Sequence, residues 1–267
     1  MSGLRLRLRE QPPERLDFSG ISADLLRGRS EKDIAALPVG TSRTGVRLGD
    51  CFDVRRADGP ALVIEGGSLR LDNVAAGLKQ GIVEIEGDVG QRLGRGMSDG
   101  RVRVRGSAGP FAATGATGGH IEIEGDADER AGAALHGAMG GIDGATLVIR
   151  GRAGAYLGDR MRSGLIVAEA AGDYAGARMI AGTLVAGTLG DYAGYGMRRG
   201  TLLAREHGRL NPTFVDTGVH RLVIVRVLER SLRPIAPHLA ELARADLNRR
   251  AGDLATLGKG ELLTPWT

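Results

Sequence analysis

Five histidines and one cysteine are the residues of this chain best suited to metal binding or nucleophilic catalysis. No histidine has a second His, Cys or carboxylate at a recognised metal-ligand spacing such as His-Glu-x-x-His. Cys51 carries no nucleophile signature around it, and we interpret it as a small buried apolar residue. The sequence therefore predicts no catalytic residue, no metal site and no cofactor-binding residue in this chain. The histidines are His120, His136, His207, His220 and His238.

Glycine pairs such as Gly94-Arg-Gly96 invite a dinucleotide-binding interpretation. That fingerprint requires a strand, the glycine-rich turn and then a helix of a βαβ unit. No helical periodicity follows these glycines. The serines likewise lack the Gly-x-Ser-x-Gly context of a hydrolase nucleophile. The 44 glycines of the chain must serve another purpose.

A repeat with glycines at regular intervals explains the high glycine content of the chain. The segment Gly-Met-x-x-Gly or a close variant ends at Gly81, Gly100, Gly164, Gly182 and Gly200, with weaker copies ending at Gly119 and Gly144. Successive closing glycines lie 19, 19, 25, 20, 18 and 18 residues apart. A period this regular is typical of a solenoid. The recurring Met97, Met161, Met179 and Met197 are predicted to form one row of the core.

Each early repeat opens with strict alternation of apolar and charged residues that ends in glycine, as in Val83–Gly87 and Val102–Gly106. This pattern predicts a short strand followed by a turn. No repeat has the length or the periodicity for a helix. We therefore predict an all-β fold, a right-handed parallel β-helix of about seven to eight coils of 18–19 residues. The predicted inward pairs are Leu62/Ile64, Val83/Ile85, Val102/Val104, Ile121/Ile123 and Leu147/Ile149.

The outward positions of the early coils alternate in charge. Glu84, Arg103 and Glu122 would become neighbours in a stack, since adjacent parallel strands lie about 4.8 Å apart. We interpret them, with Glu86 and Glu124, as ion-pair ladders. An enzyme acting on a polysaccharide stays open as an alternative, because such β-helices carry carboxylate clusters on one outer face.

The later coils change character at the aligned outward positions. We expect an apolar stripe there, and large exposed apolar patches mark interfaces. Either the C-terminal segment of this chain or another subunit must cover it. The stripe is the candidate partner interface, formed by Val148, Ile166, Leu184 and Leu202.

Both ends depart from the repeat, which divides the chain into an N-terminal cap at 1–60, a glycine-rich β-helix at 61–207 and a C-terminal extension at 208–267. Leu4, Leu6 and Leu8 alternate with arginines as in an edge strand, and Ser30 is a helix N-cap. Leu239, Leu242 and Leu247 have helical spacing, which predicts one amphipathic helix from Pro237 to Arg250 that caps the last coil or covers the stripe.

The composition of the chain limits the kinds of partner that it is expected to bind. The formal charge is +4, with Lys only at 32, 79 and 259. The arginines are dispersed without interleaved aromatics, which speaks against nucleic acid. No apolar stretch reaches transmembrane length, the first ten residues lack a signal-peptide apolar region, and a lone cysteine forms no internal disulfide. We predict a cytoplasmic protein that meets neither nucleic acid nor membrane.

The whole Gly-x-x-x-Gly-x-x-Met-x-x-Gly unit, seen at Gly90–Gly100, Gly154–Gly164, Gly172–Gly182 and Gly190–Gly200, resembles two related families. One is the C-terminal β-helix domain of the glutamate synthase large subunit. The other is the C subunit of formylmethanofuran dehydrogenase, with its methylotroph counterpart in the formyltransferase/hydrolase complex. The stretches 37–43 and 46–54 and the tail Gly252–Leu262 resemble the methylotroph protein. The resemblance covers nearly the whole chain.

This resemblance implies a non-catalytic scaffold subunit in a hetero-oligomeric complex. The complex takes a formyl group from tetrahydromethanopterin, passes it to a methanofuran-type carrier and releases formate, with the chemistry in other subunits. The carrier resembles methanofuran with a polyglutamate tail, so an arginine-rich surface that helps to hold it is a hypothesis. The alternatives are the polysaccharide enzyme, a glutamate-synthase-type linker domain and a free-standing β-helix.

Overall fold

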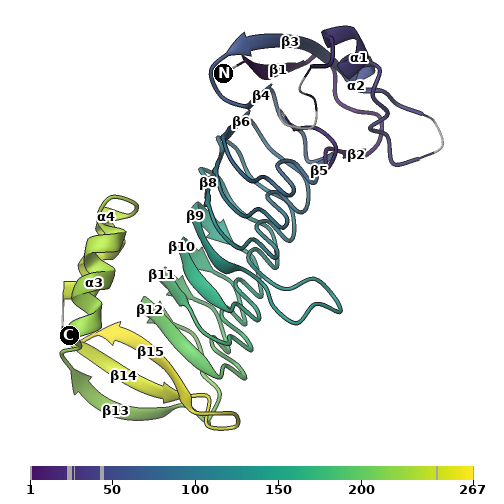
Figure 1. The fold of residues 1–267 in the computed structure, drawn as a ribbon. Coiled ribbons are helices and arrows are strands. Elements are labelled where there is room, and N and C mark those ends of the chain that lie inside the picture. Colours follow the sequence, from purple (N-terminus) through teal and green to yellow (C-terminus); the bar gives the residue numbers. More distant parts are fainter. Residues whose placement is uncertain (1, 23–25, 27, 43–44, 245, 267) are drawn as a thin grey trace.

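The computed structural model describes residues 2–22, 26, 28–42, 45–244 and 246–266. Arg43, which closes one of the stretches that resemble the methylotroph protein, lies outside them. The chain builds one 13-stranded sheet whose strands are mostly parallel, with helices near its two ends (Figure 1). The fold is therefore mostly β, as the alternation predicts.

The centre of the sheet takes one strand from each repeat. Neighbouring strands of this set follow each other in chain order and pair in parallel. The set comprises β4 (Leu62–Glu65), β6 (Ile82–Glu86), β7 (Arg101–Val104), β8 (His120–Ile123), β9 (Asp143–Ala153), β10 (Ser163–Ala171), β11 (Thr183–Leu189) and β12 (Arg199–His207).

Inward side chains of these strands form continuous rows. All five inward pairs predicted for the early repeats are at most 2% exposed, so that part of the prediction is confirmed. One row runs along the whole stack, because the strand registers place its members in line. Its members are Leu62, Val83, Val102, Ile121, Leu147, Ile166, Leu184 and Leu202.

The remainder of each repeat consists mainly of turns that stack in the same order (Figure 1). Isolated parallel bridges join Ser68, Val89, Ala108, Ala127 and Ala153 in a second, thinner ladder. Met97, Met161, Met179 and Met197 are all fully buried. The methionine row is therefore a core feature, as predicted.

The N-terminal segment covers the first repeat. β1 (Ser2–Leu8) pairs in parallel with β4 and antiparallel with β3 (Phe52–Asp58). The prediction of an edge strand is wrong, because β1 lies between two neighbours and Leu4 and Leu6 are buried on its inner face. Ser30 caps α1 (Glu31–Ala35) as predicted. α2 (Leu48–Cys51), β2 (Leu16–Asp17) and β5 (Leu71–Asp72) complete this segment.

The C-terminal extension also differs from its prediction. Its elements are β13 (Val215–His220), α3 (Val223–Leu232), α4 (Pro237–Ala240), the 3-10 turn η1 (Glu241–Arg244), β14 (Leu247–Gly252) and β15 (Lys259–Pro265). The helix predicted from Pro237 to Arg250 ends at Arg244, and Leu247 instead begins a strand. β15 pairs in parallel with β12 and so continues the stack, while β14 and β13 return antiparallel.

All four residues of the predicted partner interface, Val148, Ile166, Leu184 and Leu202, are buried within this chain, each at most 1% exposed. Ile166, Leu184 and Leu202 continue the inward row of Leu147 and are at most 1% exposed, so they cannot meet a partner on the surface. Val148 does point outward, and its neighbours in register are Val167, Val185, Leu203 and Leu263. The true outward apolar row is therefore shifted by one residue in the later repeats.

This chain itself covers the shifted row. Val167, Val185 and Leu203 form a second core with Leu232, Leu239 and other residues of the helical segment. Arg150 donates a hydrogen bond to the Ile235 carbonyl, and His238 contacts Glu169 at 2.6 Å. The segment α3–α4–η1 is thus fixed across the sheet face, one of the two positions considered for the C-terminal segment.

Candidate functional site

The histidines and the cysteine singled out in the sequence lie on different elements. Among the described residues, no three His, Cys, Asp or Glu side chains come together in a way that would hold a metal ion. His120 begins β8, where burial and then the charge of Arg101 lower its pKa. Cys51 is 1% exposed, and burial raises the pKa of its thiol. As predicted, Cys51 is packed as an apolar residue.

The early repeats bear ion pairs across neighbouring strands. Glu84, Arg103 and Glu122 lie in register, as the charge alternation predicts. Arg103 binds Glu124 at 2.6 Å, and Arg150 binds Glu122 at 2.7 Å. Burial raises the pKa of Glu122, but the hydrogen bond and charge of Arg150 outweigh it and leave that pKa lowered. Each of these two carboxylates thus pairs with an arginine of a neighbouring strand, as a ladder requires.

A row of tyrosines follows the turns of the later repeats, and the sequence interpretation missed it. Tyr156 stacks on Tyr174 with ring centroids 5.0 Å apart, and Tyr174 stacks on Tyr192 at 5.4 Å. Arg130 lies 4.6 Å from the Tyr156 ring and Arg209 lies 5.5 Å from the Tyr192 ring. The 18-residue spacing of the three tyrosines was a signal that could have revealed the row.

Removing the middle ring of this row should weaken the stack. Tyr174→Ala deletes two stacked contacts, each worth about 0.5–1.5 kcal/mol beyond burial, so we expect a loss of about 1–3 kcal/mol in unfolding free energy. Urea unfolding measures it. The matched control is Tyr195→Ala, since Tyr195 is 48% exposed and makes one edge contact with Tyr174. Equal losses for the two variants would show that stacking contributes little.

The tail Gly252–Leu262 holds a buried carboxylate. Asp253 is 1% exposed and accepts hydrogen bonds from the amides of Gly196 and Ala255, both at 2.9 Å, and from the Asn211 side chain at 3.1 Å. Burial raises the pKa of this carboxyl, but the hydrogen bonds outweigh that effect and leave the pKa lowered. The tail therefore fastens the loop before β15 to the last repeat.

Asp253→Asn should lower the unfolding free energy by about 2 kcal/mol near neutral pH, since hydrogen bonds to a charged acceptor contribute about 1.5–3 kcal/mol. The folded-state pKa is lowered, so the stabilisation is complete above the unfolded pKa of about 3.9 and is lost as pH falls through the folded value. The measurement is urea unfolding of both proteins at about pH 7 and about pH 3. A difference that is unchanged in acid would contradict this assignment.

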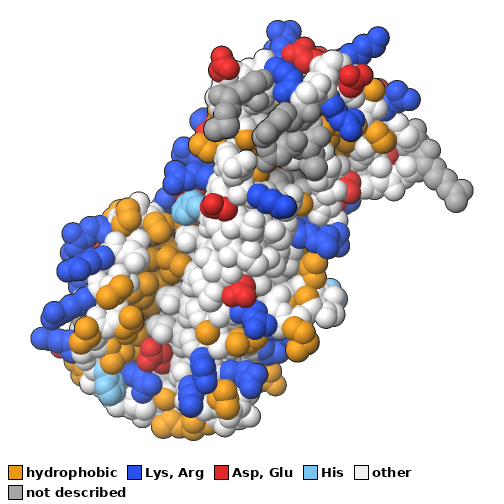
Figure 2. Space-filling model, viewed as in Figure 1, with side chains coloured by type: hydrophobic (Ala, Val, Ile, Leu, Met, Phe, Trp, Pro, Cys, Tyr) orange, Lys and Arg blue, Asp and Glu red, His pale blue; other side chains and the backbone are white. Residues whose placement is uncertain are grey.

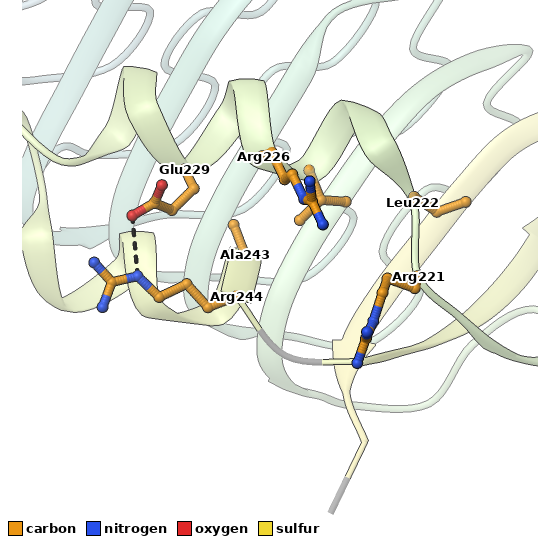
Figure 3. A pocket seen from close by; sticks show the side chains of 7 residues that line it. Arg221, Leu222, Arg226, Glu229, Ala243 and Arg244 are labelled. Atoms are coloured by element: carbon orange, nitrogen blue, oxygen red, sulfur yellow. Dashed lines mark hydrogen bonds and ion pairs between the residues drawn. The ribbon is translucent and has the colours of Figure 1, made fainter.

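A pocket of about 330 Å³ opens between α3 and η1 (Figure 3). Leu222, Val225 and Ala243 supply its apolar lining, and the arginines supply most of its polar lining. Glu229 accepts hydrogen bonds from Arg233 and Arg244, which together lower its pKa. The lining holds three arginines and a single carboxylate, which is already bonded, so the pocket is suited to an anionic group. The arginines of the lining are Arg221, Arg226 and Arg244.

Comparison with known proteins gives the family. No protein-family model matches the chain. The C subunit of the formyltransferase/hydrolase complex Fhc of Methylorubrum extorquens is 57% identical to it over 261 residues, which are 97% of this chain and 98% of that protein. This chain belongs to the family of C subunits of formyltransferase/hydrolase complexes. Membership confirms the resemblance to the methylotroph protein, rather than to the glutamate synthase domain.

The similarity to this relative extends to three dimensions. A chain in the X-ray crystal structure of the formyltransferase/hydrolase complex FhcABCD from Methylorubrum extorquens, in complex with methylofuran, superposes with a TM-score of 0.95. It is 57% identical, and the alignment covers 98% of this chain and all of that one. Within the described residues, no helix is long and apolar enough to cross a bilayer.

Proposed function

We propose that this chain is a non-catalytic structural subunit of a formyltransferase/hydrolase complex. The complex would move a formyl group from tetrahydromethanopterin through a methanofuran-type carrier to formate. The observation that carries the proposal is the sequence identity to a chain of the assembled FhcABCD complex. This identity is 57% and extends along nearly the whole length of the chain. Similarity that includes both terminal segments favours shared partners as well as a shared fold.

The proposal includes a right-handed parallel β-helix as the scaffold. Stacked repeats, two parallel ladders and a continuous inward row support it. Its parts would be an N-terminal cap at 1–60, the β-helix at 61–207 and a C-terminal extension at 208–267. Such a stack offers a long rigid surface, because each repeat contacts its neighbours and adds to a continuous face.

The proposal assigns the chemistry and the handling of the carrier to other subunits in the cytoplasm, with no cofactor held by this chain. The carboxylates that raised the polysaccharide alternative support this assignment, since Glu122 and Glu124 are engaged by Arg150 and Arg103. The burial of Cys51 supports it too, because a catalytic thiolate needs a partly exposed, electropositive environment.

The test compares the complex with and without this chain. Expression of the other subunits alone should give a poorly assembled complex with little formyl-carrier hydrolysis, and addition of this chain should restore both. The isolated chain should show no hydrolysis. Full activity of a complex that lacks the chain, or turnover by the isolated chain, would overturn the proposal.

A further inference from the structure

The outer face of α3 carries large apolar side chains where a surface helix normally has polar ones. Val225 and Leu232 face the second core and are at most 4% exposed. In contrast, Val223 is 79%, Ile224 61% and Val227 56% exposed. These three lie one helical turn apart or less, so they form a short continuous ridge. Contiguous exposed apolar surface of this kind marks an interaction site.

Exposed apolar residues also gather in the C-terminal extension as a whole. Of the twelve large hydrophobic residues that are exposed in the described part of the chain, eight lie between Val215 and Trp266. Trp266, the one tryptophan of the sequence, is 60% exposed. Its amide bonds the carbonyl of Asp246, whose carboxylate pairs with Arg221 of the pocket. Tryptophan is among the residues most enriched at the energetic centres of interfaces.

Positive charge surrounds the ridge. Arg226 and Arg230 are exposed on α3, and among the described residues neither side chain has a hydrogen-bond or ion-pair partner. Figure 2 shows basic side chains gathered along the outer edge of the region that α3 occupies in Figure 1, with apolar side chains beside them. Near the pocket, the other arginines form ion pairs: Arg221 pairs with Asp246, and Arg233 pairs with Glu229. Arg244 pairs with both Glu229 and Glu241. The unbalanced charge on this face is therefore that of Arg226 and Arg230.

We propose that this face, the ridge of Val223, Ile224 and Val227 together with the arginine-lined pocket, docks an acidic amphipathic segment of another subunit of the complex. The inference rests on the proposed function, because it requires partner subunits. Apolar side chains of the segment would cover the ridge, and an Asp or Glu carboxylate would enter the pocket beside Arg226. A small anion alone would leave the ridge exposed to water.

Cross-linking tests the occupant directly. A photoreactive benzoylphenylalanine replaces Val223 in the full chain, and the complex is purified from its own cells, irradiated and digested. We expect a cross-link to a peptide of another subunit that is rich in Asp and Glu. The same residue in place of Leu69, which is 53% exposed and lies outside the C-terminal extension, is the control. A cross-link at Val223 only within this chain or to a second copy, or none at all, would overturn the inference.

Substitutions on α3 test whether positive charge and apolar surface hold the docked segment. Arg226→Glu should weaken retention of the cross-linked subunit at least tenfold, and Ile224→Ser should weaken it similarly, without a change in the melting temperature of the isolated chain. Arg55→Glu is the matched control, since Arg55 lies on β3 at the opposite end of the stack (Figure 1). Full retention in both α3 variants would overturn the inference while the wild-type complex still supports the proposed function. Failure of the wild-type chain to bring down any subunit would instead overturn the proposed function.

Discussion

Leu184→Asp should leave almost no folded protein. Leu184 lies in the inward row between Ile166 and Leu202, is fully buried and belongs to the main core. Truncation of such a leucine costs about 2–5 kcal/mol, and burial of an unpaired carboxylate costs several kcal/mol more. The sum approaches the whole stability of a typical domain, about 5–15 kcal/mol. Circular dichroism and the soluble yield of the variant are the measurements.

Leu203 provides the comparison that separates the two faces of the sheet. It is as buried as Leu184 but belongs to the second core, under the helical segment. Leu203→Ala should cost about 2–4 kcal/mol. Its effect on amide hydrogen exchange should be concentrated in residues 223–244, whereas Leu184→Ala should speed exchange in the repeats on either side. The same exchange pattern in both variants would contradict the assigned register.

Gly164→Ala is the second substitution with a large expected effect. Gly164 has φ +98°, and a Cβ at this position would lie 2.3 Å from the carbonyl oxygen of Ala145 in the preceding repeat. The backbone of Ala145 cannot move away as a flexible side chain could, because it is part of the neighbouring layer of the stack. We expect a loss of at least about 3 kcal/mol in unfolding free energy, from the strained backbone conformation and the clash together. Urea unfolding checks it.

Gly77 gives the matched control for Gly164. It also has a positive φ, +65°, but an added Cβ would meet nothing within 4 Å. Gly77→Ala should therefore cost only the strain of the left-handed conformation, about 1–2 kcal/mol. If Gly164→Ala were no more harmful than Gly77→Ala, the repeats would not pack as closely at this turn as the structure has them.

The sequence predicted the early repeats well because their strands alternate cleanly. In β6 and β7 the charged residues can only face solvent, so Val83, Ile85, Val102 and Val104 must face inward. Alternation gives no such guide in β10, where Leu165–Ala168 is apolar on both faces. A strand covered on both faces has no polar position to set its register, so its inward residues cannot be identified by alternation.

The C-terminal helices show a different limit of prediction from sequence. The run Val223–Val227 contains four β-branched residues, which favour a strand by propensity, yet it forms α3. Val225 and Leu232 are buried in the second core together with Val185 and Leu203, which lie on strands earlier in the sequence. Burial against distant residues therefore favours the helix over the strand that local propensity predicts. The arginine-lined pocket likewise could not be predicted from the sequence, because the fold brings Arg221 and Arg226 together with Arg244 of η1.

Native mass spectrometry of the complex, purified gently through a tag on this chain, tests whether the chain is a subunit of a formyltransferase/hydrolase complex. We expect an assembly in which this chain accompanies subunits of formyltransferase and hydrolase size, with formyl-carrier hydrolysis in the same fraction. A chain that arrives alone from its own cells, with the hydrolysis activity in another fraction, would contradict it.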